Sequence, residues 1–226
     1  MILKTTQLIH LPVAKKTLKL SHGFTIIETL LAIAVFSLIL ILLVTGVMQI
    51  SRSFMRGVNT TALQSTTRSI SDRLSQDLQV STYSGSINQV AELQYFCVGG
   101  NQYVFTPGVE YTKSNGTVGL VVTRMSTPDC SAPALPLAGQ TQLLSEHTRV
   151  LFLKITRATS VSTGSYYKLS IALGAGASDL FCLQNDATCE PASSDEVYGE
   201  SVKCQTGSGS EFCAVSKLNV LVQPRI

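Results

Sequence analysis

The 226-residue sequence lacks the short motifs that mark common nucleotide-binding and hydrolytic sites. It has no Walker loop, no Gly-x-Gly-x-x-Gly and no Gly-x-Ser-x-Gly elbow. It also has no Cys-x-x-Cys pair, and beyond residue 23 its only histidine is His147, which argues against a zinc centre. We therefore predict a non-enzymatic chain with no zinc site.

Charge and proline are missing from a long stretch near the N-terminus. No Lys or Arg occurs from Leu20 to Ser51, and Thr29–Ile50 has 22 residues without charge of either sign. As a helix this run would measure about 33 Å, enough to cross a bilayer. Because no proline occurs in Phe24–Val80, we expect one continuous helix of about 85 Å.

The apolar run is too long for a secretory signal, whose core has about 7–15 residues and ends in a small-x-small cleavage site. Four lysines precede the run, at positions 4, 15, 16 and 19, whereas Arg52 and Arg56 follow it. This asymmetry predicts a cytoplasmic N-terminus and places the C-terminal part outside.

A single carboxylate, Glu28, lies in the first turn of the apolar segment. A charge at membrane depth costs on the order of 3 kcal/mol, so it indicates a function and a partner of opposite charge. Cleavage of the Gly23–Phe24 bond would create that partner, because it would leave a new N-terminal amine.

The stretch Gly23-Phe24-Thr25-Ile26-Ile27-Glu28, between a basic segment and an apolar helix, resembles the processing site of type IV pilins and type II secretion pseudopilins. The resemblance implies that a prepilin peptidase cuts after Gly23 and methylates Phe24. It also implies that Glu28 guides filament assembly by meeting a neighbour's N-terminal amine. The implied partners are the peptidase, other pilin or pseudopilin subunits, the inner-membrane assembly platform and, before assembly, membrane lipid.

Two further stretches are similar to J-type minor pseudopilins and their pilus counterparts, namely Leu31–Phe36 and Arg73–Leu78. The implied organisation is a leader over 1–23, a long helix over 24–80 with a transmembrane segment at 26–50, and an extracytoplasmic β-rich head over 81–226. The implied location is first the inner membrane, with the head outside, and later an extracellular or periplasmic filament.

The excess of basic over acidic residues comes from the predicted leader. The whole sequence has 17 basic and 14 acidic residues, and the first 23 residues hold four lysines and no acid. The remainder therefore has 13 basic and 14 acidic residues. It lacks a stripe of basic and aromatic residues, so no nucleic-acid partner is predicted.

The head is predicted to be an antiparallel sheet with one face covered by the end of the long helix, an α+β fold. The covering stripe is predicted from a spacing of four: Phe54, Val58, Ala62, Ile70, Leu74 and Leu78. Arg73 and Asp77 are expected to pair on the solvent side. Alternating apolar residues predict strands near 93–97, 151–155, 167–173 and 218–222. A hairpin turn at Gly99-Gly100-Asn101 predicts a partner strand over 102–106, and the Val- and Leu-rich stretch 117–125 is also strand-like.

All six cysteines lie in the predicted outer part, which fits disulfides in an oxidising compartment. They permit 15 pairings, and sequence alone does not choose among them. We favour Cys97–Cys130, Cys182–Cys189 and Cys204–Cys213 over the alternative of buried free thiols.

Five acidic residues gather in one segment: Asp186, Glu190, Asp195, Glu196 and Glu200. Some pseudopilins bind calcium in a C-terminal loop, and calcium needs several oxygen ligands held together. The spacing matches no EF-hand, so a solvated acidic loop is the alternative, and no other cofactor is expected. For the whole chain, the rival interpretation is a membrane-tethered binding module or adhesin that never polymerises.

Overall fold

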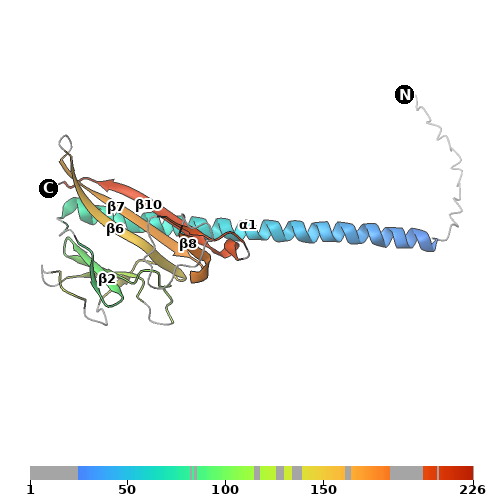
Figure 1. Cartoon of the computed structure of the whole chain (residues 1–226), viewed down its shortest axis with the longest axis horizontal. Helices are drawn as coiled ribbons and strands as arrows, with labels where there is room; N and C mark the ends of the chain where they lie inside the picture. Colours follow the sequence, from blue (N-terminus) through green and yellow to red (C-terminus); the bar gives the residue numbers. More distant parts are fainter. Residues whose placement is uncertain are drawn as a thin grey trace, which may run out of the picture. The chain divides into compact units, whose positions relative to one another are not determined.

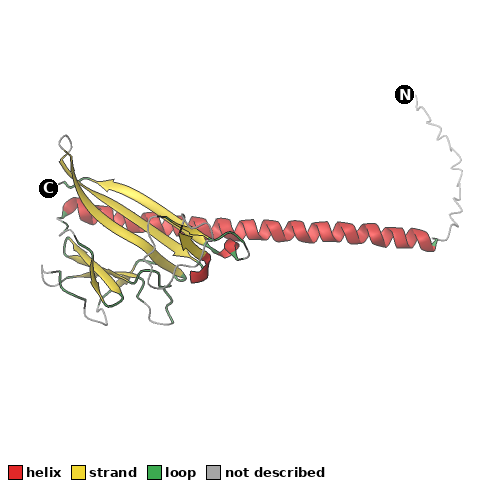
Figure 2. Cartoon of the chain, in the orientation of Figure 1, coloured by secondary structure: helices red, strands yellow, loops and turns green. Residues whose placement is uncertain are grey.

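The structure, a computed structural model, describes residues 25–81, 83, 86–114, 118–125, 130–133, 139–160, 164–183, 201–207 and 209–225. The described chain has one long helix, α1 (Ile26–Val80), followed by short and long antiparallel strands (Figures 1 and 2). This confirms the predicted α+β class. The chain divides into two compact units, Met1–Val47 and Met48–Ile226.

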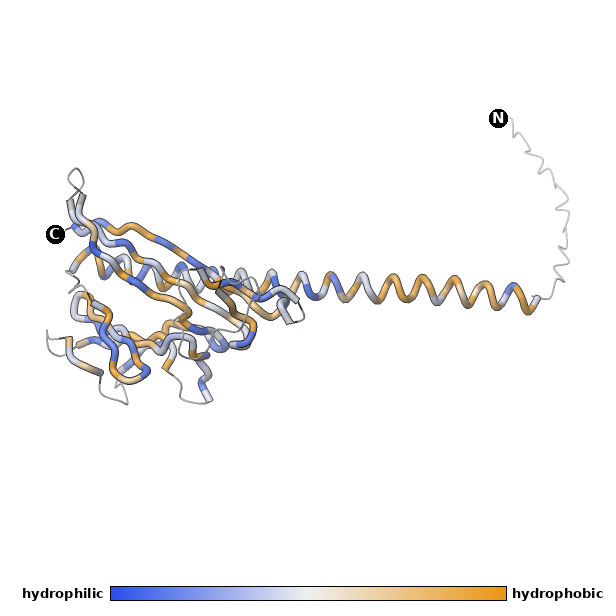
Figure 3. The backbone as a smooth tube through the Cα atoms, viewed as in Figure 1, coloured by the Kyte–Doolittle hydropathy of each residue, from blue (hydrophilic) through white to orange (hydrophobic). Residues whose placement is uncertain are grey.

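The first half of α1 is strongly apolar and fully open to its surroundings. Figure 3 shows the hydrophobic residues running along this part of the helix. By length and composition α1 can cross a membrane, and none of its most apolar 18-residue window is buried within the chain. Its few hydroxyls bond to the helix itself: Ser37 donates to the Ile33 carbonyl at 2.8 Å, and Thr45 to the Ile41 carbonyl at 3.0 Å. These hydroxyls are thus satisfied within the helix, as a hydrocarbon environment requires.

The second half of α1 buries a narrow stripe against the strands. Its buried residues are Leu63, Thr67, Ile70, Ser71, Leu74 and Leu78. Ile70, Leu74 and Leu78 confirm the predicted stripe, but its first three members are wrong. Phe54 is 66% exposed, Val58 is 48% exposed, and Ala62 is exposed as well. Residues spaced strictly by four move about 40° around the helix at each step, so a long stripe of this kind leaves the face that the strands cover. The buried residues follow steps of three and four, which keep them on one face of the helix.

Five short strands form one antiparallel sheet in chain order. They are β1 (Asn88–Val90), β2 (Leu93–Val98), β3 (Asn101–Phe105), β4 (Leu120–Arg124) and β5 (Thr141–Gln142). The predicted hairpin turn is confirmed between β2 and β3, where Gly99 and Gly100 have φ angles of +58° and +84°. Two successive residues with positive φ are what a tight hairpin turn demands, and glycine adopts them without steric cost.

The longer strands form a second antiparallel sheet with the order β10-β7-β6. These strands are β6 (Thr148–Ser160), β7 (Gly164–Ala175) and β10 (Ala214–Val222). A two-stranded sheet pairs β8 (Phe181–Leu183) with β9 (Val202–Cys204), and the short 3₁₀ helices η1 (Ser178–Leu180) and η2 (Ser210–Phe212) flank these strands in the chain. The long alternating runs of the sequence therefore form the long strands, and three sheets replace the single predicted one.

One apolar core joins the helix to both larger sheets. Leu74 and Leu78 of α1 belong to the same buried cluster as Phe96 and Tyr103 of the first sheet and Leu169 of the second. The Phe96 and Tyr103 rings stack with centroids 5.0 Å apart. The buried stripe of α1 thus packs with residues of both sheets, and this packing holds a helix segment whose many Ser and Thr residues lower its intrinsic propensity.

The end of the chain returns to the end of the helix. After β10, the backbone N–H of Arg225 donates to the carbonyl of Gln79 at 2.9 Å. The last carbonyls of a helix have no partner within it, so this bond satisfies one of them.

Candidate functional site

The predicted assembly residue lies in a capped helix start. Thr25 directly precedes α1, and its hydroxyl accepts the backbone N–H of Glu28 at 3.4 Å. Its carbonyl accepts the N–H groups of Glu28 and Thr29 at 3.0 and 3.2 Å. A threonine at the N-cap with a glutamate three residues later is the sequence pattern of a capping box. The carboxylate of Glu28 also lies at the positive end of the helix dipole.

The Glu28 side chain is exposed, and no ion pair joins it to another described residue. Gly23 and Phe24, the predicted cleavage and methylation residues, lie outside the described residues. The capping bonds thus use the backbone of Glu28, and its carboxylate is stabilised locally by the helix dipole. The structure leaves the predicted cleavage and the pairing with a neighbour's amine as predictions.

The helix end carries a polar anchor that helix periodicity did not predict. Asp77 does not pair with Arg73 in solvent; its Oδ2 accepts hydrogen bonds from the Tyr103 hydroxyl and, at 2.9 Å, from Asn101 Nδ2. Burial and the adjacent Asp77 carboxylate together raise the pKa of Tyr103 above its ordinary value. Asp77 lies one turn from the end of α1, and both donors belong to β3. This carboxylate therefore fixes the helix end to the first sheet.

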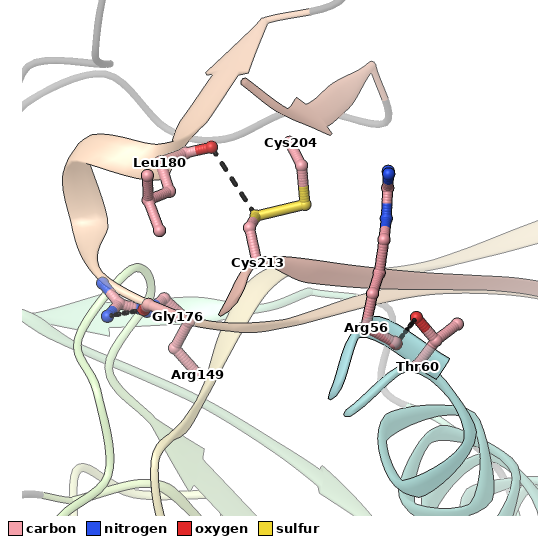
Figure 4. Close-up of a disulfide and its surroundings, with 7 residues drawn as sticks. All are labelled: Arg56, Thr60, Arg149, Gly176, Leu180, Cys204 and Cys213. Carbon is pink, nitrogen blue, oxygen red and sulfur yellow. Dashed lines mark hydrogen bonds between the residues drawn. A yellow bond between two sulfur atoms is a disulfide. The ribbon is translucent and has the colours of Figure 1, made fainter. Parts of the chain in front are cut away.

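Two of the predicted disulfides are confirmed. Cys97 of β2 is bonded to Cys130, and Cys204 of β9 is bonded to Cys213 directly before β10 (Figure 4). Each pair has its Cα atoms 5.8 Å apart, within the ordinary range for a disulfide. The second bond joins residues nine positions apart and ties the smallest sheet to the long-stranded one.

The third predicted pair lies only partly within the described residues. Cys182 is disulfide-bonded, whereas Cys189 falls outside them. The five acidic residues that were candidates for a calcium site also fall outside the described residues: Asp186, Glu190, Asp195, Glu196 and Glu200. Within the described part of the chain, no group of three or more His, Cys, Asp or Glu side chains is arranged to hold a metal ion.

His147 takes part in a network of polar contacts with Glu110 and Arg149. Its Nδ1 lies 2.8 Å from Glu110 Oε1, and the other oxygen of Glu110 accepts from Arg149 Nη2 at 3.0 Å. The Arg149 side chain is 4% exposed, donates to the carbonyls of Gly108 and Gly176, and lies over the Phe181 ring at 5.3 Å. Arg149 thus ties three chain segments together, and His147 extends the same network to the surface.

A pocket between α1 and the strands was not predicted. It has a volume of about 560 Å³ and is lined by Arg56 and Thr60 of α1 and by residues of β9 and β10. The Cys204–Cys213 disulfide lies in its wall, and Arg56 rises from the helix beside that bond in Figure 4. The sequence does hold a signal for it in Arg52 and Arg56, which directly follow the apolar run, but on sequence grounds these residues indicated only the orientation of the chain.

The sequence matches no protein-family model, and comparisons with curated proteins and with solved structures gave no match. The assignment of function therefore rests on the residues and the fold of this chain.

Proposed function

We propose that this chain is the precursor of a minor pilin or pseudopilin, a structural subunit of a type IV pilus-like or type II secretion-like filament. The observation that carries the proposal is one uninterrupted helix that combines an exposed apolar first half with a second half packed on a disulfide-bonded β head. That helix begins at Ile26, within the stretch Gly23–Glu28 that resembles a prepilin processing site.

In the proposed mechanism, the leader holds the N-terminus in the cytoplasm until a prepilin peptidase releases and methylates Phe24. The subunit then rests in the inner membrane through the apolar half of α1. An assembly motor on the membrane platform moves it outward, and its apolar helix exchanges lipid for the helices of other subunits. This exchange gains little hydrophobic free energy, because lipid and helix surfaces are similarly apolar. A charge pair at Glu28 would therefore weigh heavily in setting the register.

A second candidate is a single-span tether, for example an adhesin, that never polymerises. The place of Glu28 in the first turn of α1 favours it, because the helix dipole stabilises a carboxylate there without a neighbouring subunit. Both candidates share the anchor and the disulfide-bonded head. They differ in whether the chain is processed at Gly23 and enters a filament.

The test is the intact mass of the chain isolated from the cells that produce it, together with its recovery in sheared surface filaments. We expect a chain that begins at a methylated Phe24. The Gly23→Ala variant should keep the full mass of 24.2 kDa and be absent from the filaments. A wild-type chain that still begins at Met1, or a Gly23→Ala chain that is processed normally, would contradict the proposal.

A further inference from the structure

The pocket between α1, β9 and β10 carries positive charge at the level where the apolar run ends. Arg56 contributes from the helix, and Lys203 and Lys217 contribute from the two strands. No acidic residue is among the described residues that line it. Its volume of about 560 Å³ lies in the range of small-ligand sites, about 300–1,000 Å³.

Arg56 has no carboxylate partner among the described residues. No ion pair joins Arg56 to another described residue, whereas Arg52, one turn earlier, lies 3.7 Å from the carboxylate of Glu211. Lys203 and Lys217 each make a further contact within the chain. They therefore add positive charge to the pocket, and Arg56 is its main candidate ligand for phosphate. The planar guanidinium of arginine can bind two oxygens of a phosphate group at once.

With the apolar run spanning a bilayer, the Arg56 side chain can reach the level of the lipid headgroups. Arg56 follows Ile50, the last residue of the uncharged run, by six positions, which is about 9 Å along the helix axis. The polar layer on each side of a bilayer is several ångströms thick, about 5–8 Å. Helical side chains tilt towards the helix N-terminus, so the long Arg56 side chain leads back towards the apolar run.

We propose that this pocket binds the phosphate headgroup of an anionic phospholipid while the chain is inserted in the membrane. Arg56 holds the phosphate oxygens, and the two lysines add positive charge on the strand side. The disulfide between Cys204 and Cys213 keeps the strand wall in place, because it joins the end of β9 to the start of β10. The inference rests on membrane insertion, which the filament subunit and the tether share, and it does not depend on filament assembly.

The test uses the full chain in nanodiscs that contain equal amounts of phosphatidylglycerol and phosphatidylcholine. Native mass spectrometry then measures which lipid stays bound when the protein is released. We expect the wild type to retain phosphatidylglycerol preferentially. We expect Arg56→Gln to lower that preference about fivefold, in line with the weight of one basic residue near an anionic surface.

Arg68→Gln is the matched control, because Arg68 is an exposed arginine on the same helix, twelve positions further along and outside this pocket. It should leave the preference unchanged. Equal loss in both variants, or an unchanged preference in Arg56→Gln, would overturn the inference. Displacement of phosphatidylglycerol by millimolar inorganic phosphate would show a general anion site and would also overturn it.

Two further outcomes separate this inference from the proposed function. If the chain fails to enter nanodiscs, membrane insertion itself is wrong and both proposals fall. If Arg56→Gln binds lipid like the wild type but is lost from filaments, the pocket serves an acidic group of another subunit. That result would overturn the lipid site and leave the filament proposal in place.

Discussion

Single polar residues that are partly or fully buried fix how segments of the head are joined. Asp77 accepts bonds from Tyr103 and Asn101, and Arg149 donates to Glu110 and two carbonyls. Sequence periodicity assigned Asp77 to a helix-surface pair with Arg73, because residues four apart on a helix are neighbours. The observed partners come from β3, and a contact between distant segments leaves no periodic trace in the sequence.

Tyr83 should make the head sensitive to alkali. Its side chain is 4% exposed, its hydroxyl has no hydrogen-bond partner among the described residues, and burial raises its pKa to about 12. Because the folded pKa lies above the ordinary value of about 10, stability is unaffected below pH 10 and falls as the pH rises towards 12. The loss should be on the order of 2 kcal/mol over that interval.

Unfolding of the detergent-solubilised full chain at several pH values between about 9 and 12 checks this expectation. Tyr83→Phe removes both the titration and an unpaired hydroxyl, so its stability should fall less steeply than that of the wild type. Tyr166→Phe is the control, because the Tyr166 side chain is only partly buried. Parallel curves for wild type and Tyr83→Phe would contradict the assignment.

At the scale of elements, α1 presents different surfaces along its length. Leu63 is the first fully buried position, whereas Phe54 and Val58 stay exposed on a helix face with Gly57 between them. Sequence periodicity found the buried face from Ile70 onward, because only one register places Ile70, Leu74 and Leu78 together. It failed before Leu63, where the helix is apolar on sides that the head does not cover.

Truncating one side chain near each end of the predicted stripe should have unequal effects on the stability of the chain. Leu74 is 0% exposed within the core, so Leu74→Ala should lower the free energy of unfolding by about 2–5 kcal/mol. Phe54→Ala removes a larger side chain that is 66% exposed, and it should change stability by less than about 0.5 kcal/mol. Chemical unfolding of both full-length variants in detergent measures the difference. A Phe54→Ala cost as large as that of Leu74→Ala would show that Phe54 is buried in the isolated chain.

For the molecule as a whole, the sequence predicted the class of fold, the helix end and the longest strands. Composition and alternation suffice for these, because they reflect local periodicity. The same patterns did not predict β1, β5, β8 and β9, since strands of two or three residues show no alternation. Two cysteine pairs were predicted correctly. The packing of two sheets on one helix depends on long-range contacts that no local pattern encodes.

The role of Glu28 can be decided only in the assembled state. Under the filament proposal the carboxylate pairs with a neighbour's amine, so Glu28→Ala and Glu28→Gln should both insert in the membrane and both be depleted in sheared filaments. We expect the amount of each variant in the filaments to fall about tenfold, which corresponds to about 1.4 kcal/mol. Quantitative immunoblotting of membrane and filament fractions measures it.

Glutamine is the informative variant, because it retains a side chain suited to the third helix position but carries no charge. If Glu28→Gln enters filaments normally while Glu28→Ala does not, an uncharged contact of this side chain and not charge pairing is what assembly requires. Normal recovery of both variants would remove Glu28 from the mechanism.

The bond from the Arg225 N–H to the Gln79 carbonyl brings the last residues of the chain to the last turn of α1. A polypeptide trimmed after Val222 would lose this contact and with it a partner of the helix-end carbonyl, so labelling strategies should keep residues 223–225 in place.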